Sequence, residues 1–208
     1  MWGLHHRIRQ LLIAPSCPIC RRLCDAEPFP CAECCSQYDL GPTCRSGLKP
    51  LRWRALGLYD SHFRHLLLPL KHPGPQQRIL PALMALFREQ LALNGDVSLV
   101  PIPSWKRRMS QRNPLPELIA TGLQRPVRHL LVRTRASLSQ HHLDRKLRAQ
   151  NMQNAFTVLE QPSGQPIWLV DDILTTGATA MAARDALLHR GHGVSGLLCL
   201  GRTPLNRR

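Results

Sequence analysis

The chain has no long hydrophobic run, which excludes a protein that crosses a membrane as a helix. No stretch of its 208 residues approaches the ~20 consecutive apolar residues that such a helix needs. An apolar run near the amino end, residues 11–14, follows basic residues but is shorter than the ~7–15 apolar residues of a signal peptide. We therefore expect a cytoplasmic protein.

Acidic residues are scarce: 13 Asp and Glu stand against 28 Lys and Arg, a formal net charge of +15. The imbalance is strongest between Lys106 and Arg148, where 11 basic residues meet only two acidic ones. Such an excess predicts anionic partners, either phosphates or nucleic acid, but says nothing about the fold. Aromatic residues are also few. Trp105 is the one aromatic at this basic stretch that is suited to stack on a base, and its alternative role is packing against the loop.

Cysteine, by contrast, is abundant near the amino end, where residues 17–48 show little aliphatic periodicity. Eight cysteines suit a disulfide scaffold only in a secreted chain, and in a reducing compartment they indicate a metal site or free thiols. Two Cys-x-x-Cys pairs, separated by ten residues, present four thiolates to one tetrahedral Zn²⁺. The predicted metal ligands are Cys17, Cys20, Cys31 and Cys34. Metal binding is then expected to supply much of this module's folding free energy.

Other cysteines leave the ligand set open. Cys24, Cys35 and Cys44 are rival ligands. Because Cys35 directly follows Cys34, either of these two residues can serve as the last ligand of the second Cys-x-x-Cys pair. Free buried thiols, or the relic of a lost site, are the alternatives to zinc. Cys199 falls on an expected strand and is assigned to the core.

Apolar spacing and turn residues along the rest of the chain predict alternating strands and helices. Strands are expected over 53–59, 97–102, 130–133, 167–170 and 193–200, and helices over 61–71, 79–91, 116–123 and 177–189. This alternation is typical of an α/β fold with a doubly wound parallel sheet. The polar, basic stretch 134–153 is expected to be a loop. We therefore predict a cysteine-rich zinc-binding module at 1–48 and an α/β domain at 49–208.

The residues after the expected strand 167–170 predict a sugar-phosphate site. Ligands of open α/β sheets bind beyond the carboxyl ends of the strands, where Asp171 and Asp172 are well suited to accept hydrogen bonds from ribose hydroxyls. Threonine hydroxyls and backbone N–H groups at the following helix N-terminus are suited to a 5′-phosphate, because the helix dipole favours negative charge there. The expected phosphate-binding residues are Thr175, Thr176, Gly177, Ala178 and Thr179.

In the alternative interpretation the two acids end the strand and the Thr-Thr-Gly sequence caps the helix without a ligand. Capping alone does not call for two acids beside an anion-binding turn, and this favours the site. A basic cluster also follows the expected strand 97–102. Guanidinium groups match phosphate oxygens, so we expect this cluster to neutralise a diphosphate, with a solvated basic surface as the alternative. Its members are Lys106, Arg107, Arg108 and Arg112.

These motifs resemble those of a known family. The segment 169–179 resembles the phosphoribosyl diphosphate motif of the type I phosphoribosyltransferases, and within that superfamily the chain is similar to the ComF family, also called the GntX family. Leu70-Lys71 resembles the family's Leu-Lys-Phe element, with His72 in place of the aromatic residue. The segment 100–103 with the basic cluster resembles the pyrophosphate-side loop, and the block that begins at Arg133 resembles the family's Arg-Thr-Arg element.

The resemblance implies a type I phosphoribosyltransferase-like fold and a competence protein for DNA uptake in natural transformation. It implies binding of 5-phosphoribosyl 1-diphosphate with Mg²⁺, binding of single-stranded DNA, and a competence helicase as partner. By this resemblance Lys71 is a ligand-binding residue. Asp171 and Asp172 are the catalytic residues if the enzyme activity is retained. The alternative is an active phosphoribosyltransferase in nucleotide metabolism, acting by positioning and electrostatic stabilisation. A salvage enzyme for a purine or pyrimidine base is less favoured, since it needs neither a zinc module nor strong positive charge.

Overall fold

The computed structural model describes residues 15–24, 28–72, 74, 78–93, 95–104, 114–134 and 155–204. At its centre lies a five-stranded sheet of β1 (Arg45–Gly47), β2 (Trp53–Leu58), β3 (Ser98–Pro101), β6 (Ile167–Leu174) and β7 (Val194–Arg202). The strands lie side by side in the order β1-β2-β7-β6-β3. The last four run parallel to one another, and β1 pairs antiparallel with β2 at one edge.

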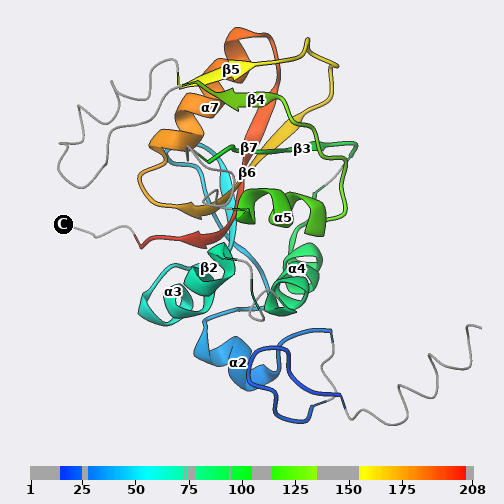
Figure 1. The fold of residues 1–208 in the computed structure, drawn as a ribbon, viewed down its shortest axis with the longest axis vertical. Helices are drawn as coiled ribbons and strands as arrows, with labels where there is room; N and C mark the ends of the chain where they lie inside the picture. The colour runs from blue at the N-terminus through cyan, green and yellow to red at the C-terminus, as the bar shows by residue number, and fades with distance from the viewer. Residues whose placement is uncertain are drawn as a thin grey trace, which may run out of the picture.

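Both faces of the sheet are covered, because successive residues of a strand point to opposite sides and here enter two different apolar cores. Trp168 and Val170 of β6 enter one core, whereas Ile167 and Leu169 enter the other. The first core is closed by α3 (Ser61–Leu67), the 3₁₀ helix η1 (Leu68–Lys71), α4 (Ile79–Gln90) and α5 (Leu115–Gly122). The second is closed by α7 (Ala178–His189) and a two-stranded sheet of β4 (Leu131–Arg133) and β5 (Phe156–Val158). The predicted doubly wound α/β fold is confirmed (Figure 1).

Each strand and helix expected between residues 53 and 200 is present, with bounds that differ by a few residues. The expected strand at 130–133 is β4, which pairs with β5 outside the main sheet. Three short elements were not expected: β1, β5 and the helix α2 (Ala32–Gln37). They are three to six residues long, too short for apolar periodicity to show. Except for Thr134, the loop expected at 134–153 lies outside the described residues.

The cysteine-rich segment packs against the end of the α/β core below α3 and α4, far from β4 and β5 (Figure 1). Leu40 is 4% exposed and belongs to the same apolar core as Leu56 and Phe63. Gln90 at the end of α4 donates to the carbonyl oxygen of Gly41 at 2.6 Å. β1 then carries the chain from this segment into the main sheet. The two parts of the molecule therefore share buried surface.

Within the described part of the chain, none of the helices combines the length and the apolar character that a membrane span requires.

Candidate functional site

The acids of the predicted site lie within β6 and not in the turn after it, which corrects the expected strand end at Val170. β3 pairs with β6 only as far as Pro101 and Val170, whereas β7 pairs with β6 through Leu174 and Arg202. The continued pairing with β7 explains why the strand runs on through two acidic residues. It also means that Asp171 and Asp172 stand on the part of β6 that extends past its pairing with β3, at the carboxyl end of the parallel sheet.

Asp172 forms an ion pair with Lys71, which joins two of the predicted site residues. The Nζ atom of Lys71 lies 2.6 Å from Oδ2 of Asp172. Asp172 is only 8% exposed, so its charge has little access to water and the lysine compensates for that loss. Lys71 reaches the strand because Leu70, next to it in η1, is fully buried in the core on that face of the sheet.

Asp171, half-buried, is the register partner of Cys199, a buried thiol in the other core. Burial, and the negative charge of Asp172, raise the pKa of Asp171 well above its ordinary value. Burial also lowers the pKa of Arg133, an effect that the charge of Asp171 partly offsets. The two neighbouring acids therefore have different surroundings, one paired with a lysine and the other influenced by an arginine.

Each of these carboxylates accepts a hydrogen bond from the N–H group that follows it. Oδ1 of Asp171 accepts the N–H of Asp172 at 2.9 Å, and Oδ1 of Asp172 accepts the N–H of Ile173 at 2.8 Å. These bonds hold the carboxylate groups close to the backbone of β6.

The predicted phosphate turn links β6 to α7. Thr175 and Thr176 are exposed, and Gly177 is buried with φ of +82°, the left-handed conformation that favours glycine. The N-cap residue of α7, Gly177, has no side chain that could cap the helix, and Oγ1 of Thr176 accepts the N–H of Ala178 at 3.4 Å. Thr179 is partly buried in the first helical turn. Threonine hydroxyls and helix N–H groups thus share one short segment, which begins three residues after Asp172.

Pro50 packs against this turn, a contact that the sequence did not suggest. A Cβ atom on Gly177 would lie only 2.2 Å from Cγ of Pro50. The short strap between β1 and β2, residues 48–52, therefore packs on the turn, and its Leu51 belongs to the same apolar core as α7. Arg202 of β7 is a second residue that sequence reasoning missed, although a lone arginine at the end of an apolar strand was a signal for it.

The predicted diphosphate-side cluster, Lys106, Arg107, Arg108 and Arg112, lies outside the described residues, as does Trp105. The strand that precedes the cluster, β3, ends at Pro101 beside Val170 of β6. The chain therefore leaves the sheet next to the acids before it enters the basic cluster. Of the Arg-Thr-Arg block, Arg133 is described, and its guanidinium lies 5.3 Å from the centre of the Phe156 ring.

The structure gathers the four predicted metal ligands. The Sγ atoms of Cys17, Cys20, Cys31 and Cys34 all lie within 4.8 Å of one another. Sulfur separations are 3.7 Å between Cys17 and Cys34 and 3.8 Å between Cys20 and Cys31. With Zn–S bonds of about 2.3 Å, the edges of a tetrahedral site are about 3.8 Å long, so the cluster fits this ion.

Two of the rival cysteines point to backbone carbonyls. Sγ of Cys35 lies 3.6 Å from the carbonyl oxygen of Pro30, and Sγ of Cys44 lies 3.6 Å from that of Gln90. Within the cluster, hydrogen bonds from the backbone and side chain of Arg22 lower the pKa of Cys20 to about 6, whereas burial raises the pKa of Cys34. A thiolate at Cys20 is the form that a metal ion binds.

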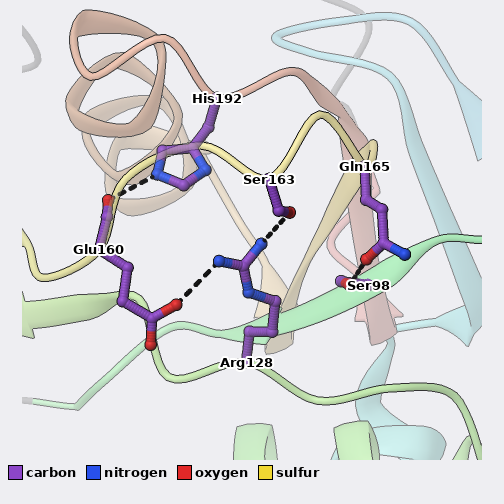
Figure 2. A network of polar contacts seen from close by, with 6 residues as sticks. All are labelled: Ser98, Arg128, Glu160, Ser163, Gln165 and His192. Atoms are coloured by element: carbon purple, nitrogen blue, oxygen red, sulfur yellow. Dashed lines mark hydrogen bonds and ion pairs between the residues drawn. The ribbon is translucent and has the colours of Figure 1, made fainter.

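A second polar network lies at the opposite, amino ends of β3 and β6 (Figure 2). Arg128 donates to Ser163 at 2.5 Å and to Glu160 at 2.8 Å, and buried His192 contacts the carbonyl oxygen of Glu160 at 3.1 Å. Ser98 donates to Gln165 at 3.1 Å. Ligands of parallel sheets bind at the carboxyl ends of the strands, so we assign this network to fixing the loop before β6.

The molecule is therefore a parallel α/β protein with paired acids and a glycine turn at the carboxyl end of its sheet, and with a four-cysteine cluster packed against its core. No family model matches the chain.

Curated relatives cover most of the chain. DNA utilization protein YhgH of Escherichia coli (strain K12) is 28% identical over 205 residues, which are 90% of each protein. The protein of the same name from Salmonella typhimurium is 28% identical over 207 residues, again 90% of each. That of Salmonella typhi is 31% identical over 135 residues, 61% of this chain and 58% of the relative.

Solved structures with some likeness are phosphoribosyltransferases. Orotate phosphoribosyltransferase of Mycobacterium tuberculosis has a TM-score of 0.36 and 20% identity and covers 80% of each chain. Orotate phosphoribosyltransferase of Aeropyrum pernix has a TM-score of 0.36 and 14% identity, over 82% of this chain and 80% of the other. The α/β fold class follows from the strand order of the main sheet and from its two apolar cores.

Proposed function

We propose that the turn 175–179, with Asp171, Asp172 and Lys71, binds a ribose phosphate such as 5-phosphoribosyl 1-diphosphate. The observation that carries this proposal is the 2.6 Å ion pair of Lys71 and Asp172, which holds a carboxylate beside a glycine turn at the open end of a parallel sheet. The acids are suited to ribose hydroxyls and the turn to a terminal phosphate, so one ligand can span both. We expect the cluster of Lys106, Arg107, Arg108 and Arg112 to contact the diphosphate.

In the cell, we infer that the protein acts in the use of incoming DNA, as a ComF-like competence protein in the cytoplasm. The names of its relatives as DNA utilization proteins and the resemblance of its motifs support this role. The net charge of +15 suits the phosphates of single-stranded DNA, which we expect as a ligand. A competence helicase is the partner that the family resemblance implies.

A second candidate is phosphoribosyl transfer itself. It is favoured by the difference between the two acids, since Asp172 is paired with Lys71 whereas the pKa of Asp171 is raised by burial. In this reaction diphosphate leaves C1 of the ribose with the bonding electrons, and an acceptor nucleophile forms the new bond. The acids then steady the positive charge that develops on the sugar. Mg²⁺, which prefers oxygen ligands, would be held by these carboxylates and would neutralise the diphosphate.

We also propose that the four-cysteine cluster holds one structural Zn²⁺. Cys17, Cys20, Cys31 and Cys34 complete a tetrahedral set, and a closed set of four protein ligands is typical of structural sites. The ion would fix the segment 15–40, which contributes few residues to the apolar core.

Ligand binding is tested by thermal unfolding with ribose 5-phosphate, with phosphoribosyl diphosphate and Mg²⁺, and with ribose alone. A ligand at 100 times its Kd stabilises the folded form by about 2.7 kcal/mol, so the two phosphorylated ligands should raise the melting temperature clearly. The variants Asp171→Asn and Asp172→Asn should lose most of this shift, and Asp185→Asn, on the exposed side of α7, should keep it. Full shifts in both site variants would refute the proposed site.

DNA binding is tested by fluorescence anisotropy with a short single strand over a range of salt concentrations. Binding through phosphates should weaken steeply with salt, and replacing Arg107 and Arg108 by Ala should make the salt dependence shallower. Release of diphosphate from phosphoribosyl diphosphate with candidate bases separates the two functions. Release at a catalytic rate favours the enzyme, and its absence with intact DNA binding favours the competence role.

A further inference from the structure

Arg202 is a buried arginine at the carboxyl end of β7, beside the turn that follows β6. It is 3% exposed, and its register partner is Leu174. Its Nη1 atom donates to the carbonyl oxygen of Leu174 at 2.8 Å and also to that of Thr175. The flat guanidinium lies over the ring of Trp53 in β2, 5.6 Å from the ring centre. Arg202 thus connects β2 and β7 to the first residues of the phosphate turn.

These two hydrogen bonds fix the direction of the N–H groups in the turn, because a peptide unit is planar and trans. In such a unit the carbonyl of one residue and the N–H of the next point in opposite directions. Since the carbonyls of Leu174 and Thr175 point toward Arg202, the N–H groups of Thr175 and Thr176 point away from it. The carbonyl oxygen of Leu174 also accepts the N–H of Thr203 at 3.0 Å, so this unit is held by two donors.

The direction away from Arg202 is the exposed side of the turn. Arg202 lies in the interior, whereas Thr175 and Thr176 are both exposed. The N–H groups are therefore presented on the side from which an anion arrives. Carbonyl oxygens in the same place would repel the anion, and a turn without fixed peptide units would have to be ordered by the ligand itself.

The guanidinium of Arg202 is a buried cation. Within residues 155–204 and the other described ranges, it forms no ion pair, and its Nε atom is buried without a hydrogen-bond partner. A cation in a low-dielectric surrounding is weakly screened, so it adds positive potential at the turn.

We propose that Arg202 is a positioning residue for phosphate binding: it holds the carbonyls of Leu174 and Thr175 inward, so that the turn presents its N–H groups to the phosphate of the ligand. The inference rests on the proposed ribose-phosphate site and adds to it a residue that does not touch the ligand. Trp53 supports it by fixing the plane of the guanidinium.

The test compares Arg202→Met and Arg202→Lys with Arg190→Met. Arg190 follows the other end of α7, about 18 Å away along a 12-residue helix, and its loss changes the net charge equally. Titration calorimetry with ribose 5-phosphate measures affinity, and hydrogen exchange of the peptide that carries residues 172–180 measures the order of the turn. Cooperative melting of each variant checks that it is folded.

We expect Arg202→Met to bind ribose 5-phosphate at least tenfold more weakly and to exchange faster at the turn, with the rest of β6 unchanged. Arg202→Lys should fall between it and the wild type, since a lysine keeps the charge but lacks the flat fork that stacks on Trp53. Arg190→Met should behave as the wild type. If Arg202→Met does not fold, the affinity and hydrogen exchange of Arg202→Lys alone decide whether the inference holds.

Wild-type affinity and wild-type exchange in the folded Arg202 variants would overturn this inference and leave the proposed site intact. A wild-type protein that does not bind ribose 5-phosphate would overturn the proposed site, and this inference with it. The two failures are therefore distinguishable in one set of titrations.

Discussion

Replacement of Gly177 by alanine tests how closely the strap of residues 48–52 covers the phosphate turn. The φ angle of Gly177 is +82°, a conformation that costs a residue with a Cβ atom about 1–2 kcal/mol. The new Cβ would lie 2.2 Å from Cγ of Pro50, and the ring would have to move by about 1.2 Å to reach ordinary contact at 3.4 Å. Overpacking of this kind costs about 1–3 kcal/mol more, so Gly177→Ala should lower the free energy of unfolding by about 2–5 kcal/mol.

Gly164 provides a matched control. Its φ angle is +80°, but a Cβ atom there would meet nothing within 4 Å. Gly164→Ala should therefore cost only the backbone term of about 1–2 kcal/mol. Replacing Pro50 by Ala removes the Cγ and Cδ atoms that the new Cβ would approach. In that background Gly177→Ala should cost about as much as Gly164→Ala.

Urea unfolding followed by circular dichroism measures these four variants, and the double-mutant cycle cancels whatever Pro50→Ala costs by itself. Ribose 5-phosphate affinity, measured on the same samples, should fall in Gly177→Ala and stay unchanged in Gly164→Ala. Equal losses of stability in the two glycine variants, or a loss at Gly177 that Pro50→Ala does not reduce, would refute the packing of Pro50 on the turn.

Three further predictions concern the metal cluster and the acids. Cys34→Ser should abolish bound zinc, measured by atomic emission, and lower the melting temperature of the whole chain, whereas Cys35→Ser should keep the ion. Loss of zinc in both variants would contradict the assignment of Cys34, and not Cys35, as the metal ligand. Because the pKa of Asp171 is raised, the folded form retains a proton that the unfolded form loses, so stability should fall as pH rises from about 3.8 toward the raised pKa. Asp171→Asn should flatten this slope in urea titrations, and an unchanged slope would contradict the assignment. Lys71→Met removes the cation that pairs with the carboxylate of Asp172 and should cost about 1–3 kcal/mol in chemical unfolding, of which Lys71→Met combined with Asp172→Asn should recover a part; equal stability of Lys71→Met and wild type would argue against the pair.

Local patterns predicted most of the elements. Apolar spacing identifies a strand or helix because the side chains of one element must face one core, and this depends on neighbours in sequence alone. The helix α7 and its glycine start followed from the residues 175–189, and the grouping of four cysteines followed from the spacing of two pairs. The shortest elements, β1 and β5, have too few residues to show any period.

The end of β6 shows where local patterns fail. Two adjacent acids suggested that the strand stops at Val170, yet pairing with β7 carries it on to Leu174. Charged residues in the sequence suggest exposure to water and therefore the end of a buried strand. The length of a strand, however, is set by the backbone hydrogen bonds to the strand beside it. That partner is β7, which follows β6 only after the helix α7 and is brought beside it by the fold.

The sequence by itself determined the α/β alternation, the position of the acid and threonine motif, and the spacing of the metal ligands. Only the tertiary structure decided that Lys71 meets Asp172, that Pro50 covers Gly177, and that Arg202 holds the carbonyls of the turn. Each of these contacts joins residues from separate segments of the chain. Their pairing follows from the strand order β2-β7-β6 and its register, which arise when the whole chain buries its two apolar cores together.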